Sequence, residues 1–137
     1  MTDMHLYYLK NKEKILSQQK KYRSTPKGAY FNLLGRCQRH NFKICGLKEF
    51  MAWYMNAERI CYYCGIPEDK LKYLPISKLF KKRFTIDKKD PTKGYFPSNM
   101  ALSCNLCNMI KSNYFTPDEM KALAKDYVTP KWQKMRH

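Results

Sequence analysis

Four of the six cysteines fall into two C-x-x-C pairs, Cys61 with Cys64 and Cys104 with Cys107. Four thiolates complete a tetrahedral zinc site, and a two-residue gap lets both sulfurs of a pair reach the same ion. Such a site keeps no open coordination position, so the zinc that it holds is structural and not catalytic. The alternatives are a redox role or two pairs that arose by chance, but no βαβ pattern surrounds either pair. The spacing therefore predicts a closed zinc site that joins two distant segments of the chain.

The charge of the chain indicates a polyanionic partner. Its 137 residues hold 27 Lys and Arg against 11 Asp and Glu, a formal net charge of +16. This excess is far above the magnitude of about 2–8 that is ordinary for a small domain. The basic residues are spread along the whole chain, which favours nucleic acid over an acidic membrane surface. A merely soluble basic protein is the remaining alternative.

Three helices are predicted in the first half. Residues 5–23 combine an imperfect apolar stripe with many lysines. Thr25 and Pro26 then have the residue types of an N-cap and a first helical position, and the helix that they start should run to about Arg39. A third helix is expected after Gly46. The residues predicted to form the core of this half are Tyr30, Leu33, Leu34, Cys37, Cys45, Phe50, Trp53 and Tyr54.

The second half changes to short strands and loops. Residues 83–87 alternate between polar and apolar types, which predicts a strand, and residues 88–99 are rich in turn formers. A return strand is expected over residues 100–104, followed by a helix that opens near Cys107. A capping box that begins at Thr116 starts a last helix. The predicted order is therefore strand, long loop, strand and helix, bracketed by the cysteine pairs.

Residues 84–113, FTIDKKDPTKGYFPSNMALSCNLCNMIKSN, resemble the ββα-metal motif of HNH (His-Me finger) endonucleases. Members often combine an acidic residue and its basic neighbour with a loop that holds Gly-Tyr and Asn, followed by C-x-x-C-N-x-x-K. The segment CYYCG, the segment CNLCNMIKSN and the preceding FMAWY are similar to the zinc-stapled branch, which includes phage HNH nucleases and rare-cutting HNH restriction enzymes. The resemblance covers about residues 45–120.

The resemblance implies a role for each matching residue. Asp87 and Asn108 would hold a hard divalent cation, Mg²⁺ or Mn²⁺, that stabilises the charge growing on the phosphate and the leaving oxygen. Asn99 matches a residue that orders the loop. Lys111 lies three residues after Asn108 on the same helix face and is expected to contact the scissile phosphate. The basic neighbours of Asp87 in the sequence favour its ionised form.

One position departs from the family pattern. The residue after the acidic ligand is usually the histidine that activates water, and here it is Lys88, which carries a proton at neutral pH unless its pKa is strongly lowered. The similar rare-cutting restriction enzymes use a tyrosine for this task, so Tyr95 in the loop is assigned as the general base, which requires its ordinary pKa of about 10 to fall. His40 is the alternative base. Lys88 then becomes a phosphate clamp.

The predicted protein is of the α+β class, with a ββα-metal core, a structural four-cysteine zinc site, a helical N-terminal half and a C-terminal helix. Its expected parts are a basic N-terminal helix over 1–25, a helical region over 26–59 that supports the core and binds DNA, a zinc-stapled nuclease core over 60–115, and a C-terminal helix and tail over 116–137. The basic residues expected to contact DNA are Lys20, Lys21, Arg23, Arg36, Arg39, Lys81, Lys82, Arg83 and Lys89.

The expected function is hydrolysis of a phosphodiester bond in double-stranded DNA with one divalent metal ion, in the manner of a restriction, homing or phage nuclease. A non-catalytic zinc-stabilised DNA- or RNA-binding module is the alternative, and the missing histidine favours it. A structural or partner-binding zinc domain is a third interpretation, which the charge disfavours. With no apolar run long enough to span a membrane and no secretory signal, we expect a cytoplasmic protein of a prokaryotic or phage-infected cell. A palindromic target would require a homodimer.

Overall fold

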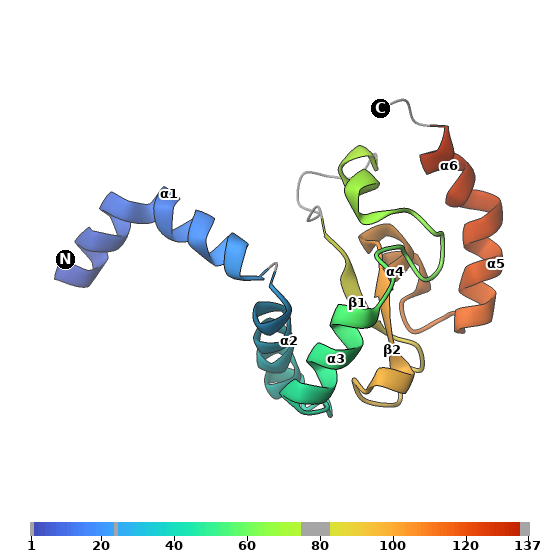
Figure 1. Ribbon diagram of the computed structural model, residues 1–137, viewed down its shortest axis with the longest axis horizontal. Helices are drawn as coiled ribbons and strands as arrows, with labels where there is room; N and C mark the ends of the chain where they lie inside the picture. Colours follow the sequence, from blue (N-terminus) through green and yellow to red (C-terminus); the bar gives the residue numbers. More distant parts are fainter. Residues whose placement is uncertain (1, 24, 75–82, 135–137) are drawn as a thin grey trace.

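The computed structural model describes residues 2–23, 25–74 and 83–134, and it combines helices with a two-stranded sheet (Figure 1). The elements follow in the order α1 (Asp3–Arg23), α2 (Pro26–His40), α3 (Leu47–Asn56), the 3₁₀ helix η1 (Glu68–Tyr73), β1 (Thr85–Lys88), the 3₁₀ helix η2 (Pro97–Asn99), β2 (Met100–Ser103), α4 (Asn105–Lys111), α5 (Pro117–Tyr127) and α6 (Thr129–Gln133). The predicted α+β class is confirmed. None of the helices in the described part of the chain is long and apolar enough to cross a membrane.

The strands β1 and β2 form an antiparallel pair, and α4 follows β2 directly. Asp87 in β1 faces Ala101 in β2, and Lys88 faces Met100. The strand–strand–helix order predicted from the sequence is therefore present. All four residues of β2 are buried, because this strand runs through the middle of the molecule (Figure 1).

Local capping chemistry starts two of the helices where the sequence predicts. The Thr25 side chain accepts a hydrogen bond from the Gly28 backbone over 3.0 Å, and Pro26 is the first residue of α2. At α5 the Thr116 hydroxyl accepts from the Glu119 backbone over 3.2 Å, and the Glu119 carboxylate accepts from the Thr116 backbone over 2.9 Å. Each cap satisfies amide groups that would otherwise lack a partner at the start of the helix.

Two clusters of buried side chains make up the core. The first surrounds the four cysteines of the C-x-x-C pairs and includes Met120, Ala124 and Val128 from the C-terminal end. The second joins α2 and α3 to the sheet and includes Phe50, which is fully buried, and Tyr95. The side chains that pack against both clusters are those of Trp53, Tyr54 and Ile86. The helical half and the sheet are therefore held together by continuous apolar contact.

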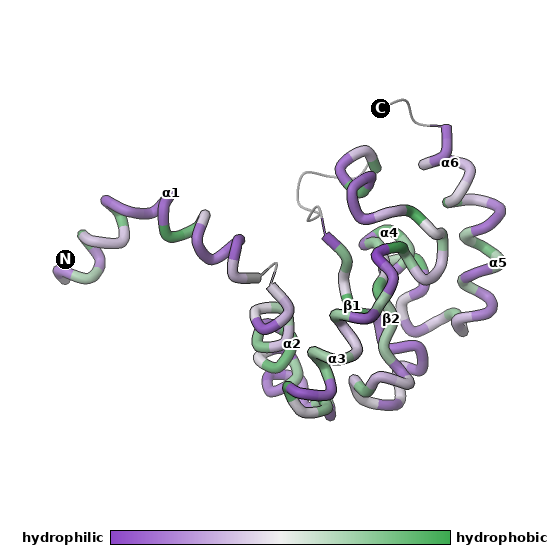
Figure 2. The backbone as a smooth tube through the Cα atoms, viewed as in Figure 1, coloured by the Kyte–Doolittle hydropathy of each residue, from purple (hydrophilic) through white to green (hydrophobic). Residues whose placement is uncertain are grey.

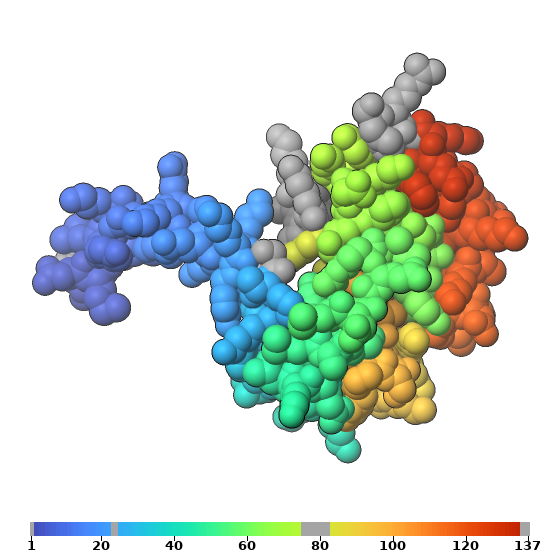
Figure 3. Space-filling model, in the orientation of Figure 1, coloured from blue at the N-terminus to red at the C-terminus, as the bar shows by residue number. Residues whose placement is uncertain are grey.

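The helix α1 projects away from the rest of the molecule and meets it through α2 (Figures 1 and 3). Hydrophilic and hydrophobic residues alternate along its whole length in Figure 2. Its exposed large apolar side chains are those of Met4, Leu6, Tyr7, Tyr8, Leu9, Leu16 and Tyr22. The apolar stripe seen in the sequence thus gains little burial, and burial against a partner is the usual source of helix stability in water.

Candidate active site and four-cysteine metal site

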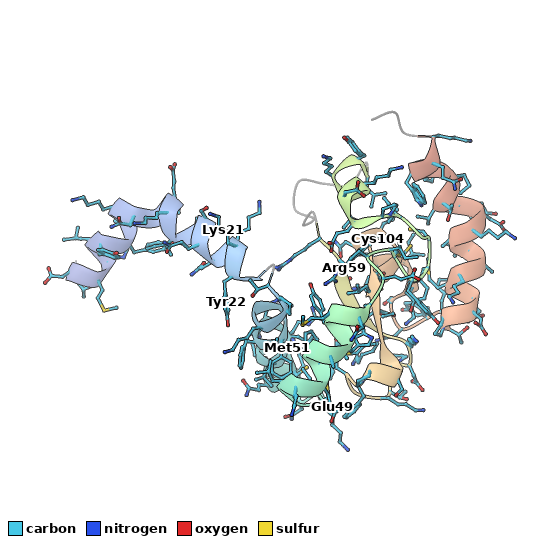
Figure 4. All side chains as sticks on the ribbon, viewed as in Figure 1. Lys21, Tyr22, Glu49, Met51, Arg59 and Cys104 are labelled. Atoms are coloured by element: carbon cyan, nitrogen blue, oxygen red, sulfur yellow. The ribbon has the colours of Figure 1, made fainter. Side chains whose placement is uncertain are left out.

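The four paired cysteines meet at one point, as the spacing predicts. The sulfurs of Cys61, Cys64, Cys104 and Cys107 all lie within 4.8 Å of one another, and all four residues are buried. The Cys64 and Cys104 sulfurs are 3.8 Å apart. A tetrahedral zinc site with metal–sulfur bonds of about 2.3 Å places its sulfurs about 3.8 Å apart, so this cluster fits a zinc ion. Figure 4 shows Cys104 inside the compact part of the molecule.

Backbone groups around the cluster prepare it for a metal ion. The N–H groups of Tyr63 and Cys64 donate to the Cys61 sulfur over 3.4 and 3.5 Å. Gly65 follows with a φ of 77°, a left-handed conformation that glycine adopts at little cost and that closes the turn. Hydrogen bonds from Cys104, Cys107 and Cys64 lower the pKa of the Cys61 thiol. Hydrogen bonds with Cys104, Cys61 and Cys64 raise the pKa of Cys107, so the cluster holds protons without metal, and binding of a metal ion would release them.

A second site lies where β1, the following loop and α4 meet. A hollow of about 260 Å³ opens there. Its lining residues are Arg36, Phe42, Ile86, Asp87, Lys88, Pro91, Tyr95, Asn108, Ser112 and Asn113. The structure therefore brings together four residues that the sequence singled out for chemistry: Asp87, Lys88, Tyr95 and Asn108.

Asp87 is a buried carboxylate, with 6% of its surface exposed. Its Oδ2 accepts a hydrogen bond of 2.5 Å from the Tyr63 hydroxyl and lies 3.3 Å from the Lys111 ammonium. Burial raises the pKa of Asp87, while Tyr63 and Lys111 act against burial and favour the carboxylate. The cation that contacts Asp87 comes from α4 and not from the neighbouring positions of the sequence, although Lys88 also interacts with Asp87 electrostatically.

Asn108 directly follows Cys107, one of the four clustered cysteines, and lies in the second turn of α4. Asp87 and Asn108 line the same hollow, so a carboxylate oxygen and a carboxamide oxygen are available to one ion. Oxygen ligands of this kind suit Mg²⁺ or Mn²⁺, which keep several waters and need few protein ligands. The donor set therefore fits the cation that the family resemblance implies.

Asn99 organises the loop between the strands. Its side-chain amide donates to the carbonyls of Asp90 and Gly94 over 3.0 and 2.9 Å, and its side-chain oxygen accepts from the Asp90 backbone over 2.9 Å. These contacts fold the loop back on itself, and backbone hydrogen bonds with Lys43 and Cys45 hold Tyr95. Gly94 is needed at its position, because a Cβ there would lie 2.6 Å from the Lys43 carbonyl oxygen.

Tyr95 points into the protein, with 3% of its surface exposed. Its hydroxyl accepts a hydrogen bond of 3.0 Å from the Arg36 guanidinium, which comes from α2. Burial raises the pKa of the Tyr95 phenol above its ordinary value, and Arg36 offsets part of that rise by charge and by hydrogen bonding. Arg36 was assigned from the sequence to DNA contact alone, and the structure gives it this second contact.

Lys88 lies over aromatic rings at the edge of the hollow. Its ammonium is 3.5 Å from the centre of the Phe42 ring and 5.3 Å from that of Tyr95. Burial lowers the pKa of Lys88, and the nearby positive charges of Arg36 and Lys111 act in the same direction. An ammonium on a ring face keeps its charge available to an anion on its other side.

Lys111 and His40 lie outside the lining of the hollow. Lys111 is fully buried, and its ammonium bonds to Asp87 and to the Lys88 carbonyl at 3.1 Å. Its contacts are therefore with protein atoms beside the hollow, and its expected contact with a scissile phosphate stays a prediction. His40 is exposed at the end of α2, stacks on Phe42 with ring centres 5.6 Å apart, and is not among the residues that line the hollow.

The basic residues assigned to DNA contact are distributed over several elements. Lys20 and Lys21 are exposed on α1, and Arg39 is exposed near the end of α2 (Figure 4 labels Lys21). Lys89 lies 4.6 Å from the centre of the Tyr62 ring. Arg23 is the last residue of α1, and Arg83 is partly buried shortly before β1. Lys81 and Lys82 lie outside the described residues.

Sequence reasoning missed two residues that contact this site. The Tyr63 hydroxyl donates a hydrogen bond to Asp87, and the Lys88 ammonium lies over the Phe42 ring. The signal for Tyr63 was its place between the two cysteines of the first pair, which fixes its backbone. Phe42 gave no comparable signal, because its contact with Lys88 joins residues that are far apart in the chain.

One of three comparisons with known proteins found a similar structure. Neither the protein-family models nor the curated proteins compared with the sequence gave a match. A search of solved structures found the rare-cutting HNH restriction endonuclease PacI, with a TM-score of 0.68, 31% sequence identity and coverage of 76% of each chain. That structure was described for the way in which PacI perturbs DNA. On this similarity the chain belongs to the HNH endonuclease family, and the predicted resemblance is confirmed.

Proposed function

We propose that this protein is a metal-dependent endonuclease that binds double-stranded DNA and hydrolyses one of its phosphodiester bonds. The observation that carries the proposal is the shared hollow of Asp87, Asn108, Tyr95 and Lys88. A protein that only binds nucleic acid has no need of a carboxylate and a carboxamide gathered in one basic hollow. The net charge of +16 supports a polyanionic substrate, and the similar protein PacI is a DNA endonuclease.

Two metals with different tasks fit the two sites. The four cysteines would hold a structural Zn²⁺ that joins the segment before η1 to the start of α4. Asp87 and Asn108 would hold one Mg²⁺ or Mn²⁺, which when bound stabilises negative charge on the phosphate and the leaving oxygen. Two protein ligands leave room on such an ion for water and for a phosphate oxygen.

The remaining residues of the hollow prepare the water and the phosphate. Tyr95 is the proposed general base, and the Arg36 hydrogen bond of 3.0 Å favours the phenolate that this task requires. Lys88 offers its ammonium to a phosphate oxygen from the edge of the hollow. The exposed lysines of α1 extend the basic surface and would contact the DNA backbone. The proposed nuclease core itself comprises residues 60–115.

A non-catalytic DNA- or RNA-binding module is the second candidate, and two observations favour it. The position after Asp87 holds Lys88 where the family usually has histidine, and burial raises the pKa of the substitute base Tyr95. Both effects act against proton abstraction from water. A cleavage assay therefore separates the two functions.

The test is incubation of supercoiled plasmid with Mg²⁺ or Mn²⁺ and the zinc-loaded protein. We expect nicked or linear product from the parent and none from Asp87→Ala or Asn108→Ala. Both variants should bind duplex DNA within a few-fold of the parent, because the basic surface is unchanged. Asp126→Ala, which replaces an exposed acidic residue on α5, is the matched control and should cut normally. A parent that binds DNA but leaves it intact with every divalent ion would establish the binding module instead.

A further inference from the structure

Asp87 is held by two side chains from different parts of the chain. The Tyr63 hydroxyl donates to Oδ2 over 2.5 Å, and the Lys111 ammonium lies 3.3 Å from the same oxygen. Tyr63 and Lys111 are buried, with 6% and 0% of their surfaces exposed, so neither contact is a transient surface encounter. Both partners contact Oδ2, and Asp87 lines the hollow, so we take its second carboxylate oxygen as the one that meets a ligand there.

Tyr63 owes its position to the four-cysteine site. It lies between Cys61 and Cys64, and its backbone N–H donates to the Cys61 sulfur over 3.4 Å. The neighbouring Tyr62 N–H donates to the carbonyl of Leu102 in β2 over 2.8 Å, which ties this turn to the sheet that carries Asp87. An ion that fixes the Cys61 sulfur therefore also fixes the tyrosine that reaches Asp87.

The second contact also originates beside the cysteines. Cys104 caps the start of α4 by accepting a hydrogen bond of 3.4 Å from the Cys107 backbone onto its sulfur. The same short helix carries Asn108 in its second turn and Lys111 at its end. Both proposed ligands of the divalent ion, Asp87 and Asn108, are thus held by elements that the cysteine cluster anchors.

We infer that Tyr63 is a positioning residue that couples the four-cysteine site to the divalent-metal site, by holding Oδ2 of Asp87 so that the other oxygen faces the hollow. The inference rests on the proposed function, because it takes Asp87 as a metal ligand. Partners that orient a metal ligand typically change metal affinity by about 10–100-fold.

The chain supplies a matched control for this tyrosine. Tyr62 lies in the same turn, with 37% of its surface exposed, and its ring contacts the ammonium groups of Lys89 and Lys121 and not Asp87. Tyr62→Phe and Tyr63→Phe each remove one hydroxyl from adjacent positions. The two variants differ in whether that hydroxyl reaches the carboxylate.

The experiment is calorimetric titration of Mn²⁺ into the zinc-loaded full chain, without DNA. We expect Tyr63→Phe to bind Mn²⁺ about 10–100-fold more weakly than the parent and Tyr62→Phe to bind it equally well. Zinc content and thermal unfolding are measured on each variant; Tyr63→Phe should keep its zinc and stay folded at the titration temperature, with a lower thermal midpoint because a buried carboxylate loses a hydrogen bond. Loss of zinc or of the fold in Tyr63→Phe would overturn the inference, because the hydroxyl would then have a structural and not a positioning role.

Two further results separate this inference from the proposed function. A zinc-loaded Tyr63→Phe that binds Mn²⁺ as tightly as the parent overturns the inference and leaves the proposed function standing. The parent should bind Mn²⁺ at a site that Asp87→Ala abolishes. If the parent does not bind Mn²⁺, or if Asp87→Ala binds it equally well, the proposed metal site is wrong and the inference is wrong with it.

Discussion

The Arg36 guanidinium donates a hydrogen bond to the Tyr95 hydroxyl over 3.0 Å, joining α2 to the loop before η2 across 59 positions of the sequence. Among the described residues, Arg36 is the hydrogen-bond partner of the Tyr95 hydroxyl. The Tyr95 ring belongs to the same buried cluster as Met100 and Cys45. Burial raises the pKa of the Tyr95 phenol, and the Arg36 cation acts against that rise, as a bound divalent cation also would. This relationship leads to two predictions about the base.

The first prediction separates the two candidate bases. Tyr95→Phe should lower the single-turnover cleavage rate by about 10²–10⁴-fold, the usual cost of losing a general base. His40→Ala should cut close to the parent rate, because His40 is exposed and is not among the residues that line the hollow. Fast cleavage by Tyr95→Phe together with an inactive His40→Ala would transfer the role to His40.

The second prediction concerns the pH dependence of cleavage. A general base acts when it is deprotonated, so the rate should rise with pH through the pKa of Tyr95. The Arg36 cation lowers that pKa, and its removal in Arg36→Met should therefore move the rising part of the profile to higher pH. Arg39→Met, from an exposed position one turn away on α2, removes the same charge without the hydrogen bond and is the control. Identical profiles for both variants would show that Arg36 does not act through Tyr95.

The third prediction concerns the buried ion pair of Lys111 and Asp87. Lys111→Met leaves a buried carboxylate without its cation, which should lower the free energy of unfolding by about 3–5 kcal/mol. Asp87→Asn in the same background removes the uncompensated charge and should restore most of that stability, a coupling that a double-mutant cycle measures. Urea unfolding of the zinc-loaded proteins is the measurement. Additive effects of the two substitutions would mean that the pair is not coupled.

The fourth prediction concerns zinc. The parent should carry one zinc ion per chain, and Cys61→Ser or Cys104→Ser should lose the ion and unfold much of the second half, because structural zinc supplies folding free energy directly. Cys45→Ala is the control: its thiol is buried in the other core cluster and should not affect zinc content. Elemental analysis and circular dichroism provide the two readings. A folded parent without zinc would refute the structural zinc site.

Local chemistry explains why much of the fold could be predicted. The caps at Thr25 and Thr116 act within four residues, so the starts of α2 and α5 follow from the sequence alone. The approach of Cys61 to Cys104 was predictable for another reason. Two C-x-x-C pairs indicate one shared metal site, however far apart the pairs lie in the sequence. Neither 3₁₀ helix was predicted, because short 3₁₀ turns have no periodic apolar pattern.

The contacts within the candidate site were harder to predict because they depend on burial and direction. Position in α4 placed Lys111 one turn after Asn108, but spacing does not say whether an ammonium turns outward to a phosphate or inward to Asp87. The Tyr63 contact with Asp87 joins residues 24 positions apart, and it exists because the first cysteine pair is folded against β2. Motif matching therefore identified the candidate ligands, and packing determined what holds them.

The last prediction concerns how the protein holds DNA. Neutralising phosphates releases counterions, so affinity for duplex DNA should fall steeply between about 50 and 200 mM salt. The basic helix α1 projects from the molecule with Lys20 and Lys21 exposed, so removing residues 1–24 should reduce the slope of log affinity against log salt. The slope is expected to fall by about 0.9 for each phosphate that the shortened chain no longer neutralises.

A control with the helix kept in place tests whether charge is the cause. Lys20→Gln with Lys21→Gln should reduce the slope by about two units or less while α1 remains helical by circular dichroism. An unchanged slope after deletion of residues 1–24 would mean that α1 stays clear of the DNA. Its exposed apolar side chains, Leu9 and Leu16 among them, would then remain to be explained by a contact other than DNA.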